Sequence, residues 1–297
     1  MKKTFIILLT ALVCTALNGC RTVHVQGPEI PAPAVKPKIA EAKKTLKSKA
    51  PTELPAVLGG IVQSDSWVIY KDKQQEEFSG NVSYDNGTYQ FRADYALSER
   101  AKNRFTARGN VYLKQNDPQG SSYEAYAHYA RYNYKTQQGE LKSSAQKQIK
   151  LIYTDEKKQT GTAWTDKATF DLAQKIFTLE GNVRVERPTP AGKEILTAQK
   201  VTFKQSVNYA ILEGDAKITD GLRTLDAQTI VYDGNKNYSY AYGARPMAYG
   251  KNEENTFAII ADQVSADNEG KKIVLDGKVQ GWVVAPKLNE ADINSKF

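Results

Sequence analysis

Hydrophobic and polar residues alternate along most of the chain after Ile61. Segments such as "EGNVRV" at 180–185 place an apolar residue at every second position, which is the side-chain period of a β-strand. Gly and Asn interrupt these segments at short intervals, and the region shows no strong apolar spacing of the helical kind. The pattern predicts an all-β domain of short antiparallel strands.

A sixteen-residue interval occurs seven times within this region and joins a small residue to a Gly, or to a Ser in the third copy. The intervals begin at Ser64, Ala93, Ala127, Thr165, Ala198, Ala227 and Ala261, and they end at Gly80, Gly109, Ser143, Gly181, Gly214, Gly243 and Gly277. Successive copies start 29 to 38 residues apart, a period typical of repeat architectures. With two strands in each copy, the seven repeats predict about fourteen strands.

Each copy has the same internal pattern. The small residue is followed by Asp, Gln or His, as at Asp166 and Gln199, and apolar residues lie two positions before it and three positions after it. Because these two positions differ in parity, both sets point inward only if the chain turns a corner or bulges at the Asp or Gln. The terminal Gly shares the inward parity of its apolar neighbours, so it leaves space, permits a kink or lets two backbones approach. A two-sheet sandwich, a jelly roll and a β-solenoid all fit this pattern.

The first twenty residues, "MKKTFIILLTALVCTALNGC", combine a basic start, an apolar core and a small-residue end. This is the anatomy of a secretory signal, and its apolar stretch is too short to span a bilayer. The ending "LNGC" resembles the lipobox of bacterial lipoproteins, which implies cleavage before Cys20 and lipidation of its thiol. Cys14 would leave with the signal, so the mature chain could form no internal disulfide. The alternative is an ordinary exported protein with an incidental Cys at the cleavage site.

Composition divides the chain into four parts. We expect a signal peptide at 1–19, a lipidated Cys and a Pro/Ala/Lys-rich tether at 20–58, a β-domain at 59–286 and a flexible tail at 287–297. The formal net charge is +8, a value that suits anionic partners such as lipid head groups or phosphorylated glycolipids. Export argues against nucleic acid as a partner.

The predicted domain contains no set of residues that would indicate an enzyme. His128 is its one histidine and occupies the position of Asp or Gln in the other copies. Metal-ligand spacing, a phosphate-binding loop and a nucleophile elbow are not found, so we expect no catalysis, metal or cofactor. Seventeen tyrosines, densest in "YEAYAHYARYNY" at 123–134, indicate either an aromatic wall for acyl chains or sugar rings, or ordinary strand propensity.

The combination of small-Asp/Gln, alternating apolar residues and Gly-Asn-Val resembles the OstA-like family of lipopolysaccharide transport proteins, which includes LptA and LptC. The segments "SGNVSY" at 79–84, "RGNVYL" at 108–113 and "EGNVRV" at 180–185 are similar to that family's signature, and the resemblance extends from about Ile61 to Val284. It implies a V-shaped antiparallel β-jellyroll whose two sheets do not close completely. Ser143, Ala244-Arg245 and a lipid anchor depart from the pattern and leave the subfamily open.

Together with the lipid anchor expected at Cys20, the resemblance implies a periplasmic, lipid-anchored carrier or bridge protein that binds the acyl chains of lipopolysaccharide (lipid A) or a related glycolipid for transport to, or assembly in, the outer membrane. The candidate groove residues are the bulky inward residues of the middle copies: Phe105, Phe170, Phe177, Leu179, Val201, Phe203, Leu212, Ile230 and Tyr232. The sequence leaves open whether they line a groove or fill a closed core. The alternative function is a structural envelope lipoprotein with a β-sandwich domain and no lipid cargo.

An open jelly roll ends in unpaired strands, here near 61–70 and 271–284, and such edges pair with strands of other chains. At the C-terminal edge we expect Val279, Gln280, Trp282 and Val283 to contact another OstA-like domain or a second copy of this chain. Arg21 follows Cys20, at the position where Asp is the usual inner-membrane retention signal of bacterial lipoproteins. This analogy predicts an anchor in the outer membrane, facing the periplasm, rather than in the inner membrane.

Overall fold

A computed structural model of the chain describes residues 60–117, 120–189, 192–236, 238–251, 256–267 and 272–284. The predicted signal peptide, the tether with Cys20 and the predicted C-terminal tail lie outside the described residues. Within the described ranges, no helix has the length and apolar character needed to cross a membrane.

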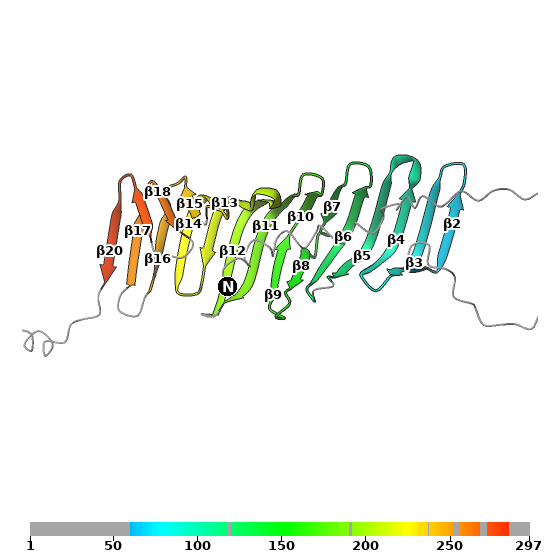
Figure 1. Cartoon of the computed structure of the whole chain (residues 1–297), viewed down its shortest axis with the longest axis horizontal. Helices are drawn as coiled ribbons and strands as arrows, with labels where there is room; N and C mark the ends of the chain where they lie inside the picture. The colour runs from blue at the N-terminus through cyan, green and yellow to red at the C-terminus, as the bar shows by residue number, and fades with distance from the viewer. Residues whose placement is uncertain are drawn as a thin grey trace, which may run out of the picture.

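The described residues form one sheet of 20 strands in which all pairs are antiparallel (Figure 1). The strands are β1 (Ile61–Gln63), β2 (Ser66–Tyr70), β3 (Gln75–Asp85), β4 (Tyr89–Glu99), β5 (Arg104–Asn116), β6 (Ser122–Asn133), β7 (Gln138–Lys142), β8 (Ile149–Thr154), β9 (Thr160–Thr165), β10 (Lys167–Asp171), β11 (Ile176–Thr189), β12 (Gly192–Lys204), β13 (Tyr209–Thr219), β14 (Arg223–Asp233), β15 (Tyr238–Tyr242), β16 (Met247–Lys251), β17 (Thr256–Ile260), β18 (Gln263–Asp267), β19 (Ile273–Asp276) and β20 (Gln280–Val284). Single turns of 3-10 helix follow β4 (η2, Arg100–Lys102) and β12 (η3, Gln205–Val207).

The strands are arranged as fourteen consecutive passes of the chain, each of which pairs with the next. Eight passes are the long strands β3 to β6 and β11 to β14, and the other six are each divided into two shorter strands, such as β1 and β2 or β19 and β20. The number of passes agrees with the fourteen strands expected from seven repeats. The all-β prediction is confirmed.

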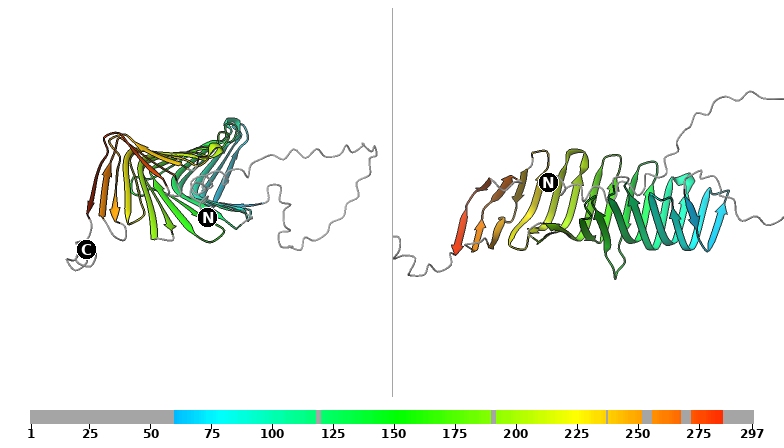
Figure 2. Two further views of the ribbon diagram at one scale, coloured as in Figure 1. Left: turned by 60° about the vertical axis from the view of Figure 1, so that its left-hand side comes forward. Right: turned by 60° about the horizontal axis from the view of Figure 1, so that its bottom comes forward.

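Each pass bends at a corner, so that the sheet is folded along its length into two layers that diverge from the corner (Figure 2). The first layer contains β2, β7, β10, β15, β18, β19 and the matching halves of the long strands, and the second contains β1, β8, β9, β16, β17, β20 and the other halves. Inward residues of both layers form a core that extends from Ala93 in β4 to Val264 in β18. The predicted V-shaped jelly roll is therefore present.

The corner contains a β-bulge in the long strands β3, β5, β11 and β13. Between β11 and β12, Glu180 pairs with Lys200 and Val183 with Ala198, so that Gly181 and Asn182 together face one residue. Both bulge residues have left-handed backbones, with φ of +80° and +46°. Of the two alternatives expected at the Asp or Gln, a corner or a bulge, the structure has the corner, and the extra residue belongs to the neighbouring Gly-Asn strand. Gly and Asn accept the left-handed conformation at low cost, which explains this placement.

Contacts across the corner explain the sixteen-residue interval. The Asn182 side chain donates a 2.8 Å hydrogen bond to Asp166, sixteen residues earlier, and the same contact joins Asn81 to Asp65 at 2.9 Å. A Cβ atom at Gly181 would lie 2.6 Å from the Asp166 carboxylate. The Gly thus makes room for the Asp side chain, and a change in the interval would separate the two partners.

Candidate functional site

All nine candidate groove residues lie on the inward side of the first layer, in two adjacent rows that cross the strands. The aromatic row, farther from the corner, consists of register neighbours from β5 to β14: Phe105, Tyr132, Gly139, Phe170, Phe177, Phe203, Ala210 and Tyr232. The aliphatic row, next to the corner, consists of Leu179, Val201, Leu212 and Ile230. The fold therefore brings the candidates together into one continuous apolar surface.

The candidates are buried in this structure. Seven of the nine are 4% exposed or less, and the other two, Phe105 and Tyr232, are partly buried against the same core. Within the aromatic row, the rings of Tyr132 and Phe170 stack with centroids 6.0 Å apart. Gly139 lies between these two strands in register, and a Cβ there would collide with the Phe170 ring. Because Gly139 has no side chain, the rings of Tyr132 and Phe170 on the two flanking strands can stack across it.

The opposite wall of the interior comes from the second layer, and our sequence-based candidates did not include it. Its apolar row contains Phe91, Leu113, Leu151, Val185, Leu196 and Ile218. The two layers meet directly where Phe91 and Phe105 form an edge-to-face contact with centroids 5.4 Å apart. The apolar residues two positions before the small residue, as at Leu196, and four positions after the Gly, as at Val185, were the available signal for this wall.

Charged residues lie where the two layers diverge. The Arg187 guanidinium, one step farther from the corner than Val185, forms an ion pair with Glu194 on β12. Burial raises the pKa of Tyr232, at the edge of the aromatic row, and the nearby positive charge of Arg187 opposes that shift. A cation from the second layer therefore approaches an aromatic residue of the first layer at the open side of the interior.

The two ends of the sheet expose both backbone edges and apolar side chains. In the described part of the chain, β1 and β2 pair only with β3, β19 pairs only with β18, and β20 pairs only with β17. Trp67 is 54% exposed at the first end and Val283 is 67% exposed at the other. The candidate contact residues Val279, Gln280, Trp282 and Val283 are all exposed in the last pass. Trp282 also borders a hollow of about 390 Å³ lined by apolar side chains that include Met247 and Phe257.

Candidate metal ligands are not grouped in the described ranges: no three His, Cys, Asp or Glu side chains lie close enough to hold an ion. His128, at the corner position of β6, is exposed.

Comparison with known proteins gives a family match for part of the chain. Residues 61–206 match the family described as LptA/(LptD N-terminal domain) LPS transport protein. Among solved structures, LptH of Pseudomonas aeruginosa, the LptA-homologous periplasmic component of its lipopolysaccharide transport device, is similar at 14% identity and a TM-score of 0.21, over 49% of this chain and 75% of that one. No curated protein is similar enough to count as a relative. Residues 61–206, just under half of the chain, are thus similar to the OstA-like family of lipopolysaccharide transport proteins.

Proposed function

We propose that this protein is a periplasmic, lipid-anchored carrier or bridge that holds the acyl chains of lipopolysaccharide, or of a related glycolipid, inside the β-jellyroll. The observation that carries the proposal is the continuous apolar interior, which extends across the strands toward both exposed ends of the sheet. Each Å² of apolar surface that an amphiphile with several acyl chains leaves in water costs about 25 cal/mol of free energy relative to burying it. A protein that moves it through the periplasm must therefore cover that surface.

Acyl chains would enter from the side where the two layers diverge. The aromatic row lies nearest that opening, so Phe177, Phe203 and Tyr232 would contact the chains first. Entry requires the layers to move apart at contacts such as Phe91–Phe105. Arg187, at the same opening, would face the acidic head group.

A second function, a structural envelope lipoprotein without cargo, is favoured by one observation. Seven of the nine candidates are as buried as the residues of a filled core. Native mass spectrometry of the full-length chain after mild extraction separates the two functions. A carrier should retain a bound glycolipid, whereas a well-folded chain that repeatedly lacks one would support the structural function.

A pair of variants makes this measurement sharper. Ala210→Leu adds bulk to the aromatic row between Phe203 and Tyr232, so we expect it to lower the fraction of chain with bound glycolipid. Thr202→Leu makes a similar addition on the outward side of β12 and should leave that fraction unchanged. Equal losses in both variants would argue against cargo in the interior.

The proposed location rests on Cys20, which lies outside the described residues. Cys20→Ala should release the protein as a soluble periplasmic form, because the lipid that holds it to the membrane can no longer be attached. Arg21→Asp is the matched variant and should move the protein from the outer-membrane to the inner-membrane fraction. Recovery of the unmodified protein wholly in the inner membrane would contradict outer-membrane anchoring.

The proposed partners are other OstA-like domains, or a second copy, added strand by strand to an exposed end. A photo-crosslinking residue at Gln280 in β20 should capture such a partner in cells, because that strand has a free backbone edge among the described strands. The control probe is Lys157, which is exposed in the turn between β8 and β9. Capture at Lys157 but not at Gln280 would rule out pairing through this edge.

A further inference from the structure

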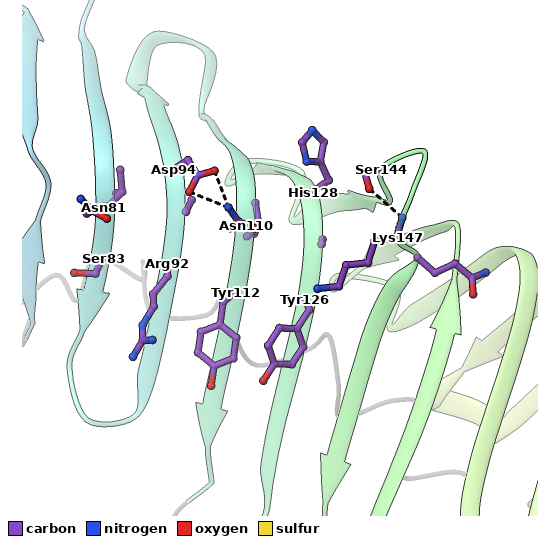
Figure 3. A pocket seen from close by; sticks show the side chains of 15 residues that line it. Asn81, Ser83, Arg92, Asp94, Asn110, Tyr112, Tyr126, His128, Ser144 and Lys147 are labelled. Atoms are coloured by element: carbon purple, nitrogen blue, oxygen red, sulfur yellow. Dashed lines mark hydrogen bonds between the residues drawn. The ribbon is translucent and has the colours of Figure 1, made fainter.

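A polar and aromatic hollow of about 630 Å³ lies on the outer side of the sheet, next to the corner (Figure 3). It is lined by β3 to β6 and by the loop 143–148 that follows β7. Arg92, Tyr112 and Tyr126 form its floor, while their chain neighbours Ala93 and Val111 are buried in the core. The hollow therefore lies on the opposite side of the strands from the apolar interior.

Strand register places four side chains of the outer face next to one another. Arg92, Tyr112, Tyr126 and Lys150 are successive neighbours on β4, β5, β6 and β8. At the usual spacing of strands, this row is about 14 Å long. The Arg92 guanidinium lies 5.6 Å from the centre of the Tyr112 ring, and the Tyr112 and Tyr126 rings are 5.0 Å apart. The arrangement is an aromatic platform with a cation at each end.

The platform is held in place by its surroundings. The Tyr126 hydroxyl donates a 2.7 Å hydrogen bond to Glu124, which fixes the orientation of the ring. Burial raises the pKa of Tyr126 to about 12, and the Glu124 carboxylate adds to the shift, so the hydroxyl stays neutral at physiological pH. The neighbouring amide of Asn110 is bound to Asp94 at 3.0 Å.

Positive charge predominates in and beside the hollow. Within the described ranges, Arg92, Lys147 and Lys150 take part in no ion pair, whereas Lys114 on the same face is paired with Glu124 at 3.1 Å. Asp94 is the one carboxylate among the lining residues. An anionic group in the hollow would therefore meet Arg92 and Lys147, which form no ion pair in the described ranges, whereas Lys150 beside it already interacts with Glu124.

The fold itself does not require these residues. The same outward row in the C-terminal half contains Thr197, Lys217, Asp226 and Met247, in place of the two tyrosines and their flanking cations. There, Lys217 is paired with Asp226 at 3.3 Å. Equivalent positions of the repeat are thus filled by other, half-buried side chains, so the corner can form without the two tyrosines and their flanking cations.

We infer that the hollow binds an anionic oligosaccharide, with a sugar ring on Tyr112 and Tyr126 and its carboxylate or phosphate group at Arg92 and Lys147. The flat C–H side of a sugar ring packs on an aromatic face, and Ser83 and Asn110 can hydrogen-bond its hydroxyls. The inference is independent of acyl-chain binding, because it concerns the other side of the strands. Two sources share this chemistry: carboxylated cell-wall glycan and the phosphorylated sugars of lipopolysaccharide.

Titration calorimetry of the full-length chain in detergent tests the inference. The probes are a cell-wall glycan tetrasaccharide, the deacylated core oligosaccharide of lipopolysaccharide, and neutral maltotetraose. At least one anionic probe should bind about tenfold more tightly than the neutral one, because charge-assisted hydrogen bonds contribute that much. Added salt should weaken its binding, and the anionic probe that binds identifies the source.

Variants identify the site. Tyr112→Thr with Tyr126→Thr keeps strand propensity and should lower the affinity about tenfold. Arg92→Gln with Lys147→Gln should remove the preference for the anionic probe. Tyr242→Thr, at an exposed position of the first layer, is the control and should bind normally. The inference fails if neither anionic probe binds the folded chain, or if the double tyrosine variant, folded by circular dichroism, binds as the unmodified chain does.

Discussion

Phe203→Ala should lower the free energy of unfolding by about 3–5 kcal/mol, the largest stability effect that we expect from a single substitution. The Phe203 side chain is 1% exposed and lies in the aromatic row between Phe177 and Ala210 on the neighbouring strands. Truncation removes its apolar contacts and leaves a cavity, since the strands on either side hold their spacing through backbone hydrogen bonds.

Denaturant unfolding of the full-length chain measures this effect through the transition midpoint. Val207→Ala is the control, because this residue of η3 is 47% exposed, and it should change stability by no more than about 0.5 kcal/mol. The result also distinguishes a packed core from a groove. A loss below about 1 kcal/mol for Phe203→Ala would mean that the ring borders open space rather than a filled interior.

Gly181→Val should destabilise the protein by about 1–3 kcal/mol. The position has a φ of +80°, which a β-branched residue adopts only with strain. The new Cβ would also approach the Asp166 carboxylate to 2.6 Å and disturb its hydrogen bond with Asn182. Thermal unfolding measures the change, and an unaltered melting temperature would show that the corner does not depend on this Gly.

Gly87→Val separates the two causes of that loss. Gly87 lies in the turn between β3 and β4 and has a φ of +82°, and a Cβ atom there would meet nothing within 4 Å beyond its chain neighbours. It therefore carries the backbone strain without the collision, and its substitution should cost less than Gly181→Val. Ser143→Gly should be tolerated, because Gly ends the interval in the other six copies.

Local patterns in the sequence were sufficient for the fold class and for the inward residues of the first layer. Side chains alternate along any strand, so Phe177 and Leu179 share a side of β11 whatever the strand pairs with. The repeated interval similarly reports a contact between adjacent passes, as between Asp166 and Asn182. The family signature around the Gly-Asn pairs carried the likeness to lipopolysaccharide transport proteins, which the family match bears out.

The placement of the bulge and the opposite wall depended on pairing between strands. A sequence of alternating residues does not show which strand of a pair holds the extra residue, and only the register between β11 and β12 assigned it to Gly181 and Asn182. In the same way, Phe91 and Phe105 come into contact because the sheet folds at its corner. That contact joins two layers, and alternation along one strand contains no information about the layer that faces it.

The outer hollow likewise combines features that the sequence predicts with features that only strand pairing decides. The sequence by itself determined that tyrosines are concentrated near residues 123–134, and that this region alternates as a strand. Only the tertiary structure decided that Tyr126 is a neighbour of Tyr112 and that Arg92 and Lys150 lie at the two ends of the pair. The physical reason is that these residues lie on four strands, and hydrogen-bond register between strands sets which side chains meet.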